Sequence, residues 1–390
     1  MSASRVLHSL VEVSPLERPS PVALESFYRP GLDILRLLAF CLVFLAHGLI
    51  GSIDSPTQTG AIARAGEFGV SVFFFLSSYL ITELLLREKR ETGTIVIPAF
   101  YARRILRIWP LYFAMIGAGW LYGLVSASHT LSAGWILALL LLCSNWYTVR
   151  HGYPPGFLFP LWSIALEEQF YLAWPWLVKR LPGKAVLGVA AAFIGLAYLS
   201  IAVLLSRGAS LDPGLWVNSL VQFQFFALGA ITAVVVRGRL LRLSQPWRWL
   251  LFAAGLICMR GAQAAVYVND PTTPHDFLHI APRFLLAMTG CLCLFFCLQQ
   301  ARGGSLQRPL IYLGKISYGL YVFHIVWLGI GRDVLERLYT GRRFGLGFEL
   351  AVMAFAFPAT VVTATLSYRY LESPFLRLKK RFTLVSSRPV

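Results

Sequence analysis

The chain has 390 residues, of which 57% are hydrophobic and only 14% are charged, whereas soluble domains carry about 25% charged residues. Apolar runs near the length that crosses roughly 30 Å of hydrocarbon recur from residue 31 to residue 370. The composition excludes a pair of ordinary soluble domains and predicts an all-α, polytopic membrane bundle. The net charge of +17 would suggest a nucleic-acid partner in a soluble protein. Here the basic residues lie in short loops that flank apolar runs, so we expect a lipid bilayer as partner and no nucleic acid.

The apolar runs predict about ten transmembrane helices. They cover residues 31–51, 68–86, 108–126, 161–178, 185–205, 216–236, 249–267, 279–300, 310–331 and 347–368. A further apolar stretch, 132–146, is short for a span, and stretches of about 10–14 apolar residues more often form re-entrant or interfacial segments. We therefore expect 132–146 not to cross the membrane.

Basic residues set the expected orientation, because Lys and Arg concentrate in cytoplasmic loops. They gather in 87–107, 179–184, 237–248, 302–315 and 377–381. Ten crossings then place both termini in the cytoplasm, although Arg332, Arg342 and Arg343 fall on the other side.

The expected division is a cytoplasmic tail at 1–29, a membrane domain at 30–376 and a basic cytoplasmic tail at 377–390. Residues 1–29 lack the apolar core of a signal peptide, and we expect no additional soluble domain. The six cysteines all lie in apolar runs, in spacings that match no zinc or disulfide framework. Neither a metal nor a disulfide is therefore expected.

The first span carries three ionisable residues, and charges within spans are costly enough that they usually serve a function. Asp33 and Arg36 are three residues apart, so they share a helix face and can pair. His47 follows eleven residues after Arg36, which is close to three turns and roughly 16 Å along the axis. The span therefore predicts a cation near the cytoplasmic surface and an imidazole deeper on the same face. The alternative is a snorkelling arginine with a hydrogen-bonded histidine of the core.

The span at 161–178 carries two adjacent carboxyl groups, which cannot share a helix face. Glu167 and Glu168 lie among Trp162, Ser163 and Tyr171. They predict either a polar pocket within the membrane or an interfacial helix start with an aromatic belt.

Two more segments combine polar residues at helical spacing. Arg104 and Arg107 lie one turn apart, and guanidinium groups suit phosphate oxygens, although cytoplasmic anchoring explains them equally. Ser317, Tyr318 and His324 belong to one polar stripe of a later span.

The order of these segments resembles the acyltransferase 3 family of membrane-bound acyltransferases, which includes bacterial O-acetyltransferases of surface polysaccharides. The resemblance covers about residues 27–376. It rests on Arg36 with His47, FFFLSSYL at 73–80, RRILRIWPLY at 103–112, LWSIALEEQFYLAWP at 161–175, ISYGLYVFH at 316–324 and YLESP at 370–374. One departure is Ser78, where the family usually has Gly, and we expect it to change only the packing.

The resemblance implies an enzyme that moves an acyl group, expected to be acetyl, from cytoplasmic acyl-CoA to a carbohydrate hydroxyl. Acyl-CoA would be a substrate, with no bound cofactor, and exopolysaccharide or lipopolysaccharide O-antigen would be the acceptor. The bacterial inner membrane would be its location. The geometry of the first span suggests that the acyl group arrives from the cytoplasm and the acceptor from the far side.

The resemblance also implies roles for individual residues. His47 would be the catalytic base, since an imidazole titrates near neutral pH, and Glu167 or Asp33 would orient it. Arg36, Arg104 and Arg107 would hold the donor's phosphates. The other expected substrate-binding residues are Trp162, Ser163, Tyr171, Ser317, Tyr318 and His324.

Two other functions fit the same residues. Intramembrane His, Glu and Arg also form proton relays and substrate sites in transporters, although no paired halves are visible in the sequence. An acyltransferase with a macrolide or lipid acceptor would have the same membrane core. Acyl transfer without any ion gradient would distinguish an enzyme from a transporter.

Overall fold

The computed structural model describes residues 28–52, 57–126, 129–239, 241–263, 276–301, 304–338 and 345–383, which form helices and no strand. The predicted all-α class is confirmed. The expected tails at 1–29 and 377–390 lie mostly outside the described residues, as do Arg302, Arg342 and Arg343.

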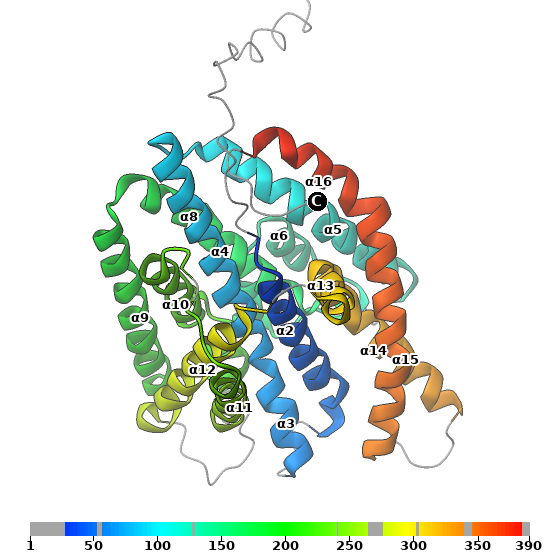
Figure 1. The fold of residues 1–390 in the computed structure, drawn as a ribbon. Helices are drawn as coiled ribbons and strands as arrows, with labels where there is room; N and C mark the ends of the chain where they lie inside the picture. Colours follow the sequence, from blue (N-terminus) through cyan, green and yellow to red (C-terminus); the bar gives the residue numbers. More distant parts are fainter. Residues whose placement is uncertain are drawn as a thin grey trace, which may run out of the picture.

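The helix α2 (Pro30–Gly48) lies in the middle of the bundle (Figure 1) and packs against α3 (Gln58–Glu67), α4, α13 (Arg308–Lys315) and α14. The other long helices are α4 (Gly69–Thr92), α5 (Ile97–Val125), α8 (Leu161–Arg180), α9 (Gly183–Ser206), α10 (Ser219–Val236), α11 (Gln245–Ala262), α12 (Phe277–Leu298), α14 (Ser317–Leu338) and α15 (Leu346–Ser367). Because α2 carries Asp33, Arg36 and His47, its central position surrounds these residues with protein and keeps them from lipid.

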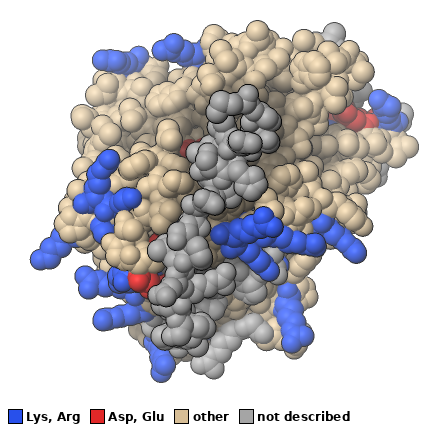
Figure 2. Space-filling model, turned by 90° about the horizontal axis from the view of Figure 1, so that it is seen from above, with Lys and Arg blue, Asp and Glu red and all other residues tan. Residues whose placement is uncertain are grey.

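Hydrogen bonds between loops define one end of the bundle, which we call the basic end. Lys89 at the end of α4 donates to the carbonyl of Lys179 at 3.0 Å, and Arg29 before α2 donates to the carbonyl of Gly238. Seen from above, Lys and Arg side chains are spread around the edge of this face, with few Asp or Glu among them (Figure 2). The segments predicted to be cytoplasmic at 87–107, 179–184 and 237–248 therefore meet at one end.

Other loops meet at the opposite end, which we call the far end. Ser52, after α2, donates to Glu349 at 2.7 Å. Arg260, near the end of α11, donates to Gln58 at 3.1 Å. The two ends give the bundle the polarity that basic loops predict.

Seven described helices are long and apolar enough to cross a membrane, or eight when α13 and α14, bent by 75°, count as one span. They account for all the predicted spans except 161–178 and 249–267. The corresponding helices, α8 and α11, run between the two ends but contain Glu167 and Glu168 or Arg248 and Arg260, which lower their hydropathy. The polytopic membrane bundle is confirmed, and the number ten stays a prediction.

The stretch at 132–146 does not cross the bundle. It forms two short helices, α6 (Ala133–Leu140) and α7 (Ser144–His151), each of 8 residues. Such helices are roughly 12 Å long, well short of a span. The rings of Tyr122 and Phe157 on either side of this segment lie 5.8 Å apart, so the chain returns to the place where it left α5, as predicted.

The structure corrects the boundaries around the first basic segment. We expected a loop over 87–107 and a span that begins at 108, but α4 continues to Thr92 and α5 begins at Ile97. Pro110 therefore lies inside a helix of 29 residues, which is more common in membrane helices than in soluble ones. As a consequence, Arg104 and Arg107 sit on a rigid helix and can face the bundle interior.

Candidate active site

Most of the predicted site residues line one cavity, which has about 760 Å³ of empty volume and which we call the inner cavity. Helices α2, α4, α5, α8 and α14 converge on it. Its predicted members are Arg36, Arg104, Arg107, Ser163, Glu167, Tyr171, Ser317 and Tyr318. The bend between α13 and α14 brings Ser317 and Tyr318, at the first turn of α14, into the wall.

A second cavity of about 650 Å³, the outer cavity, adjoins the first and shares Arg36, Arg104 and Arg107 with it. Its wall also contains Arg29 and Lys379, which belong to the basic end. The two cavities therefore form a route from the basic end into the bundle, with three guanidinium groups at their junction.

The charges at this junction favour an anion. Asp33 pairs with Arg36 at 3.0 Å, which offsets one of the three cations and confirms the predicted pairing. The guanidinium of Arg104 lies 5.7 Å from the ring centre of Tyr171, and its buried Nε has no hydrogen-bond partner among the described residues. Guanidinium groups form strong, directional hydrogen bonds with phosphate oxygens, so a phosphate-bearing ligand suits this junction.

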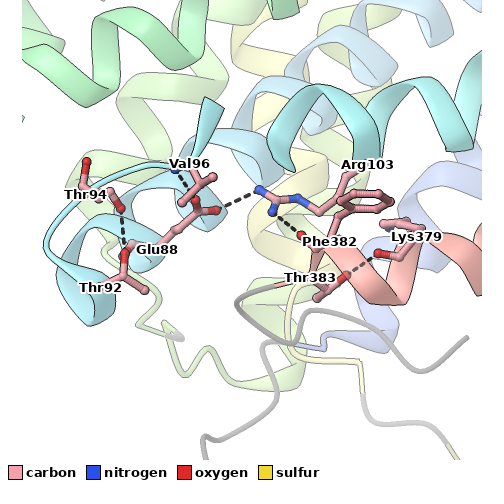
Figure 3. A network of polar contacts seen from close by, with 8 residues as sticks. All are labelled: Glu88, Thr92, Thr94, Val96, Arg103, Lys379, Phe382 and Thr383. Atoms are coloured by element: carbon pink, nitrogen blue, oxygen red, sulfur yellow. Dashed lines mark hydrogen bonds and ion pairs between the residues drawn. The ribbon is translucent and has the colours of Figure 1, made fainter. Parts of the chain in front are cut away.

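The neighbouring Arg103 has a different function. It donates to Glu88 and to the carbonyl of Phe382, both at 2.8 Å, and Glu88 also accepts from the backbone of Val96 (Figure 3). This network ties α4 and α5 to the segment that follows α16 (Ser373–Lys379). Since Lys379 lines the outer cavity, Arg103 holds the chain beside the cavity entrance.

The adjacent glutamates point in different directions, as their spacing predicts. Glu167 accepts hydrogen bonds from Ser77 and Tyr171 in the inner cavity. Glu168 accepts from the indole of Trp109 at 3.2 Å. Glu167 is thus the carboxyl group of the pair that a ligand in the inner cavity would meet.

His47 makes its closest contact with another histidine. Its Nδ1 lies 2.8 Å from Nε2 of His324, and the two rings stack with centres 5.0 Å apart. Nδ1 of His324 in turn lies 2.5 Å from the backbone carbonyl of Tyr321. Both histidines are almost completely buried, so each polar contact contributes strongly to their orientation.

These contacts determine which ring nitrogens carry protons in the neutral pair. A carbonyl only accepts, so Nδ1 of His324 must be the donor to Tyr321 and its Nε2 must accept. Nδ1 of His47 is then the donor between the rings, which leaves the lone pair on Nε2 of His47. A base at this position would act through Nε2.

Nε2 of His47 faces a carboxyl group that we did not predict. Oε1 of Glu67 lies 3.5 Å from this nitrogen, and both side chains are about 5% exposed. Gly66 and Gly69 bring Glu67 close to α2, because a Cβ on either glycine would clash with a backbone carbonyl of α2. A single carboxyl group directly before an apolar run was the available signal in the sequence.

Other predicted residues lie elsewhere. The structure does not bring Asp33 or Glu167 to His47: Asp33 pairs with Arg36, and Glu167 bonds to Ser77 and Tyr171. Trp162 is buried outside the cavity wall, with its ring 6.1 Å from that of Phe74.

His324, which is predicted to bind substrate, contacts His47 and lines neither of the two cavities.

A hydrogen bond separates the inner cavity from the histidines. The hydroxyl groups of Ser163 and Tyr321, which both line the cavity, lie 2.7 Å apart. The ring of Tyr321 lies 5.6 Å from that of His324. A ligand that enters from the basic end would therefore meet this hydrogen bond first, and the histidine pair lies behind it.

Residues 29–369 match the family model described as an acyltransferase domain, that of acyltransferase 3. The chain belongs to this family. It is 29% identical over 369 residues to a Bacillus subtilis protein named "Putative peptidoglycan O-acetyltransferase YrhL", an alignment that covers 89% of this chain and 55% of the relative. It is 27% identical over 374 residues to "Peptidoglycan O-acetyltransferase OatA" of Listeria monocytogenes, which covers 89% of this chain and 56% of that protein. The chain thus spans little more than half the length of these relatives, and no solved structure matches it significantly.

Proposed function

We propose that this protein is a membrane O-acyltransferase that moves an acetyl group from acetyl-CoA to a hydroxyl group of a carbohydrate. The observation that carries the proposal is the pair of adjoining cavities that lead from the basic end, past Arg36, Arg104 and Arg107, to the hydrogen bond between Ser163 and Tyr321, behind which the histidine pair lies. Membership of the family and the names of its relatives support the same reaction.

The donor side fits a coenzyme A thioester. Such a molecule carries several phosphate charges at one end and an uncharged acyl group at the other. The three arginines would hold phosphates at the junction of the cavities, and the slender pantetheine arm would extend along the inner cavity toward Ser163 and Tyr321. Coenzyme A thioesters are cytoplasmic metabolites, so the basic end would face the cytoplasm. This orientation agrees with the concentration of Lys and Arg in cytoplasmic loops, and both termini would lie on that side.

The chemistry needs a base at the inner end of that path. Nε2 of His47 would take the proton of the acceptor hydroxyl as its oxygen attacks the thioester carbonyl. The carbon–sulfur bond then breaks, and the thiolate takes the proton back from the imidazolium. Glu67 would stabilise the imidazolium, and His324 would hold the ring in the required tautomer.

The acceptor is proposed as a glycan of the bacterial cell envelope, and the protein as a resident of the inner membrane. The resemblance of the motifs suggests exopolysaccharide or O-antigen, whereas the relatives' names refer to peptidoglycan. All three present sugar hydroxyl groups outside the cytoplasm.

The test is transfer of label from acetyl-CoA to an envelope glycan fraction in membranes that contain the wild type or His47→Ala at matched expression. We expect labelling by the wild type and a loss of at least about a hundredfold in His47→Ala, since removal of a general base costs about 10²–10⁴ in rate. His151→Ala is the matched control, because His151 is exposed and stacks on Tyr147 away from the cavities. Equal labelling by wild type and His47→Ala would remove His47 from the chemistry, and no labelling by either would favour a transporter.

A further inference from the structure

The direction of Nε2 of His47 shows from where an acceptor must come. Because Nδ1 faces His324, the only ring nitrogen with a free lone pair faces Glu67. The helix α3 runs inward from Gln58 at the far end of the bundle to Glu67 (Figure 1). A hydroxyl group that gives its proton to Nε2 must therefore approach on the side of Glu67, opposite the arginines.

Two aromatic rings lead from His47 toward that side. The ring of Phe159 meets His47 edge to face, with centres 5.0 Å apart. The ring of Tyr153 meets Phe159 in the same way at 5.1 Å. Both belong to the segment between α7 and α8, and both are half-buried, whereas His47 is 5% exposed. The rings thus connect the buried base to the accessible face of the far end.

A second carboxyl group lies beside these rings. The hydroxyl of Tyr153 donates to Asp212 at 2.5 Å. Asp212 is half-buried and close enough to Glu67 for their charges to interact. The loop that carries Asp212 is held there by Trp216, whose ring packs against that of Phe68, next to Glu67, at 5.3 Å.

This combination of groups suits a sugar. Aromatic rings bury the apolar C–H face of a pyranose, and carboxylate oxygens accept hydrogen bonds from its hydroxyl groups. The half-buried carboxylate of Asp212 would repel an anionic ligand, so the site suits an uncharged sugar. The cavities that lead from the basic end are not lined by Glu67, Tyr153, Phe159 or Asp212.

We propose that Tyr153, Phe159 and Asp212 form the acceptor subsite and bind an uncharged sugar residue, which places a hydroxyl group against Nε2 of His47 beside Glu67. This inference rests on the proposed function and adds the residues that hold the acceptor and the acceptor's charge class. The hydroxyl proton moves to Nε2, the sugar oxygen bonds to the acyl carbon, and the thiolate leaves toward the basic end.

The experiment measures binding without any donor. The wild type in lipid nanodiscs is titrated with a tetrasaccharide of N-acetylglucosamine, an uncharged probe, and binding is followed by saturation-transfer NMR. We expect saturable binding that is weakened at least tenfold by Phe159→Leu and by Asp212→Ala. The matched control is Phe157→Leu in the same segment, which should bind as the wild type does because Phe157 packs on Tyr122.

The affinity for coenzyme A is measured on the same samples and should be the same in all variants. An unchanged affinity shows that each variant is folded. Equal tetrasaccharide affinity in wild type, Phe159→Leu and Asp212→Ala would overturn the subsite, and so would the absence of binding by the wild type. Failure of the proposed function would appear separately, as an absence of acetyl transfer to any glycan by a wild type that still binds the tetrasaccharide.

Discussion

At the scale of single residues, the proposed chemistry depends on which nitrogen of His47 carries a proton. In serine hydrolases a carboxylate occupies Nδ1 of the histidine and Nε2 faces the nucleophile. Here His324 occupies Nδ1, with the carbonyl of Tyr321 behind it, and Glu67 lies beside Nε2. Glu67 would therefore stabilise the protonated ring from the side on which the proton arrives.

Replacement of Glu67 by glutamine tests this position. We expect Glu67→Gln to lower kcat by about 10–100-fold, because hydrogen bonds to charged groups contribute about 1.5–3 kcal/mol. The KM for acetyl-CoA should stay unchanged, since Glu67 lines neither cavity. Steady-state kinetics with both substrates measures the two constants.

Glu167→Gln is the matched comparison, because Glu167 lies in the inner cavity. It should change the KM for acetyl-CoA. A fall in kcat for Glu167→Gln with normal kcat for Glu67→Gln would return the orienting role to the residue predicted from sequence.

The same residues show what sequence reasoning can reach. Arg36 and Glu167 were predicted as site residues because charges within apolar runs need a polar surrounding. Arg104 was predicted because guanidinium groups suit phosphate oxygens, and the three residues do share a cavity. Asp33 was predicted to orient His47, but 14 residues of helix put it roughly 21 Å away, and the structure pairs it with Arg36. Glu67 was missed because it lies on another helix, and spacing along one helix does not reveal the neighbour.

At the scale of helices, glycines set the distances that build the site. Gly229 of α10 lies against the backbone of α4, where a Cβ would clash with the carbonyl of Phe75. In the same contact between α4 and α10, Ser78 of α4 donates to the carbonyl of Phe226 of α10 at 2.5 Å. Ser78, at the position where glycine is usual, is thus accommodated by a hydrogen bond between the two helices.

Gly229→Val should separate α4 from α10. We expect a loss of at least about 1–3 kcal/mol of stability, the usual effect of overpacking, and lower acetyl transfer because α4 carries Ser77 beside Glu167. Thermal unfolding in detergent measures the first effect. Gly195→Ala is the control, since a Cβ at Gly195 of α9 meets no atom within 4 Å. An equal loss of stability in both variants would contradict the close contact.

The network around Arg103 predicts a different combination of effects. Arg103→Ala leaves Glu88 buried without its cation, which costs about 3–5 kcal/mol, and releases the segment beside Lys379. We expect a lower unfolding temperature and a raised KM for acetyl-CoA, with little change in the KM for the acceptor.

Arg90→Ala is the control for Arg103→Ala, because the side chain of Arg90 is 52% exposed and its ion pair with Glu83 is 3.9 Å long. Exposed pairs contribute about 0–1 kcal/mol. A normal donor KM in Arg103→Ala would separate this network from the donor entrance.

Helix boundaries were less predictable than helix positions. Nine of the ten predicted spans coincide with one helix each, because hydrophobic length identifies them, whereas 310–331 covers α13 and α14, which are bent by 75°. Pro110, however, lies within α5, and the basic residues expected in a loop belong to the ends of α4 and α5. A run of charged residues after an apolar run is typical of a loop, although here α4 continues through Arg87, Lys89 and Arg90.

At the scale of the whole molecule, the two ends of the bundle differ in charge and in chemistry. The basic end leads through the two cavities to the arginines, and the far end presents Tyr153, Phe159 and Asp212. The charge asymmetry was readable from the sequence. The polar residues of α8 and α11 lower the hydropathy of these helices, so hydropathy alone does not establish that they cross the membrane. The structure shows them as long helices of the same bundle.

Sealed inside-out membrane vesicles give the decisive measurement, because their cytoplasmic face points outward. Labelled acetyl-CoA is added outside, and the N-acetylglucosamine tetrasaccharide is enclosed inside. We expect acetylated tetrasaccharide to accumulate in the lumen with the wild type and not with His47→Ala. Acetylation of tetrasaccharide supplied on the same side as acetyl-CoA, with none in the lumen, would contradict transfer from one end of the bundle to the other.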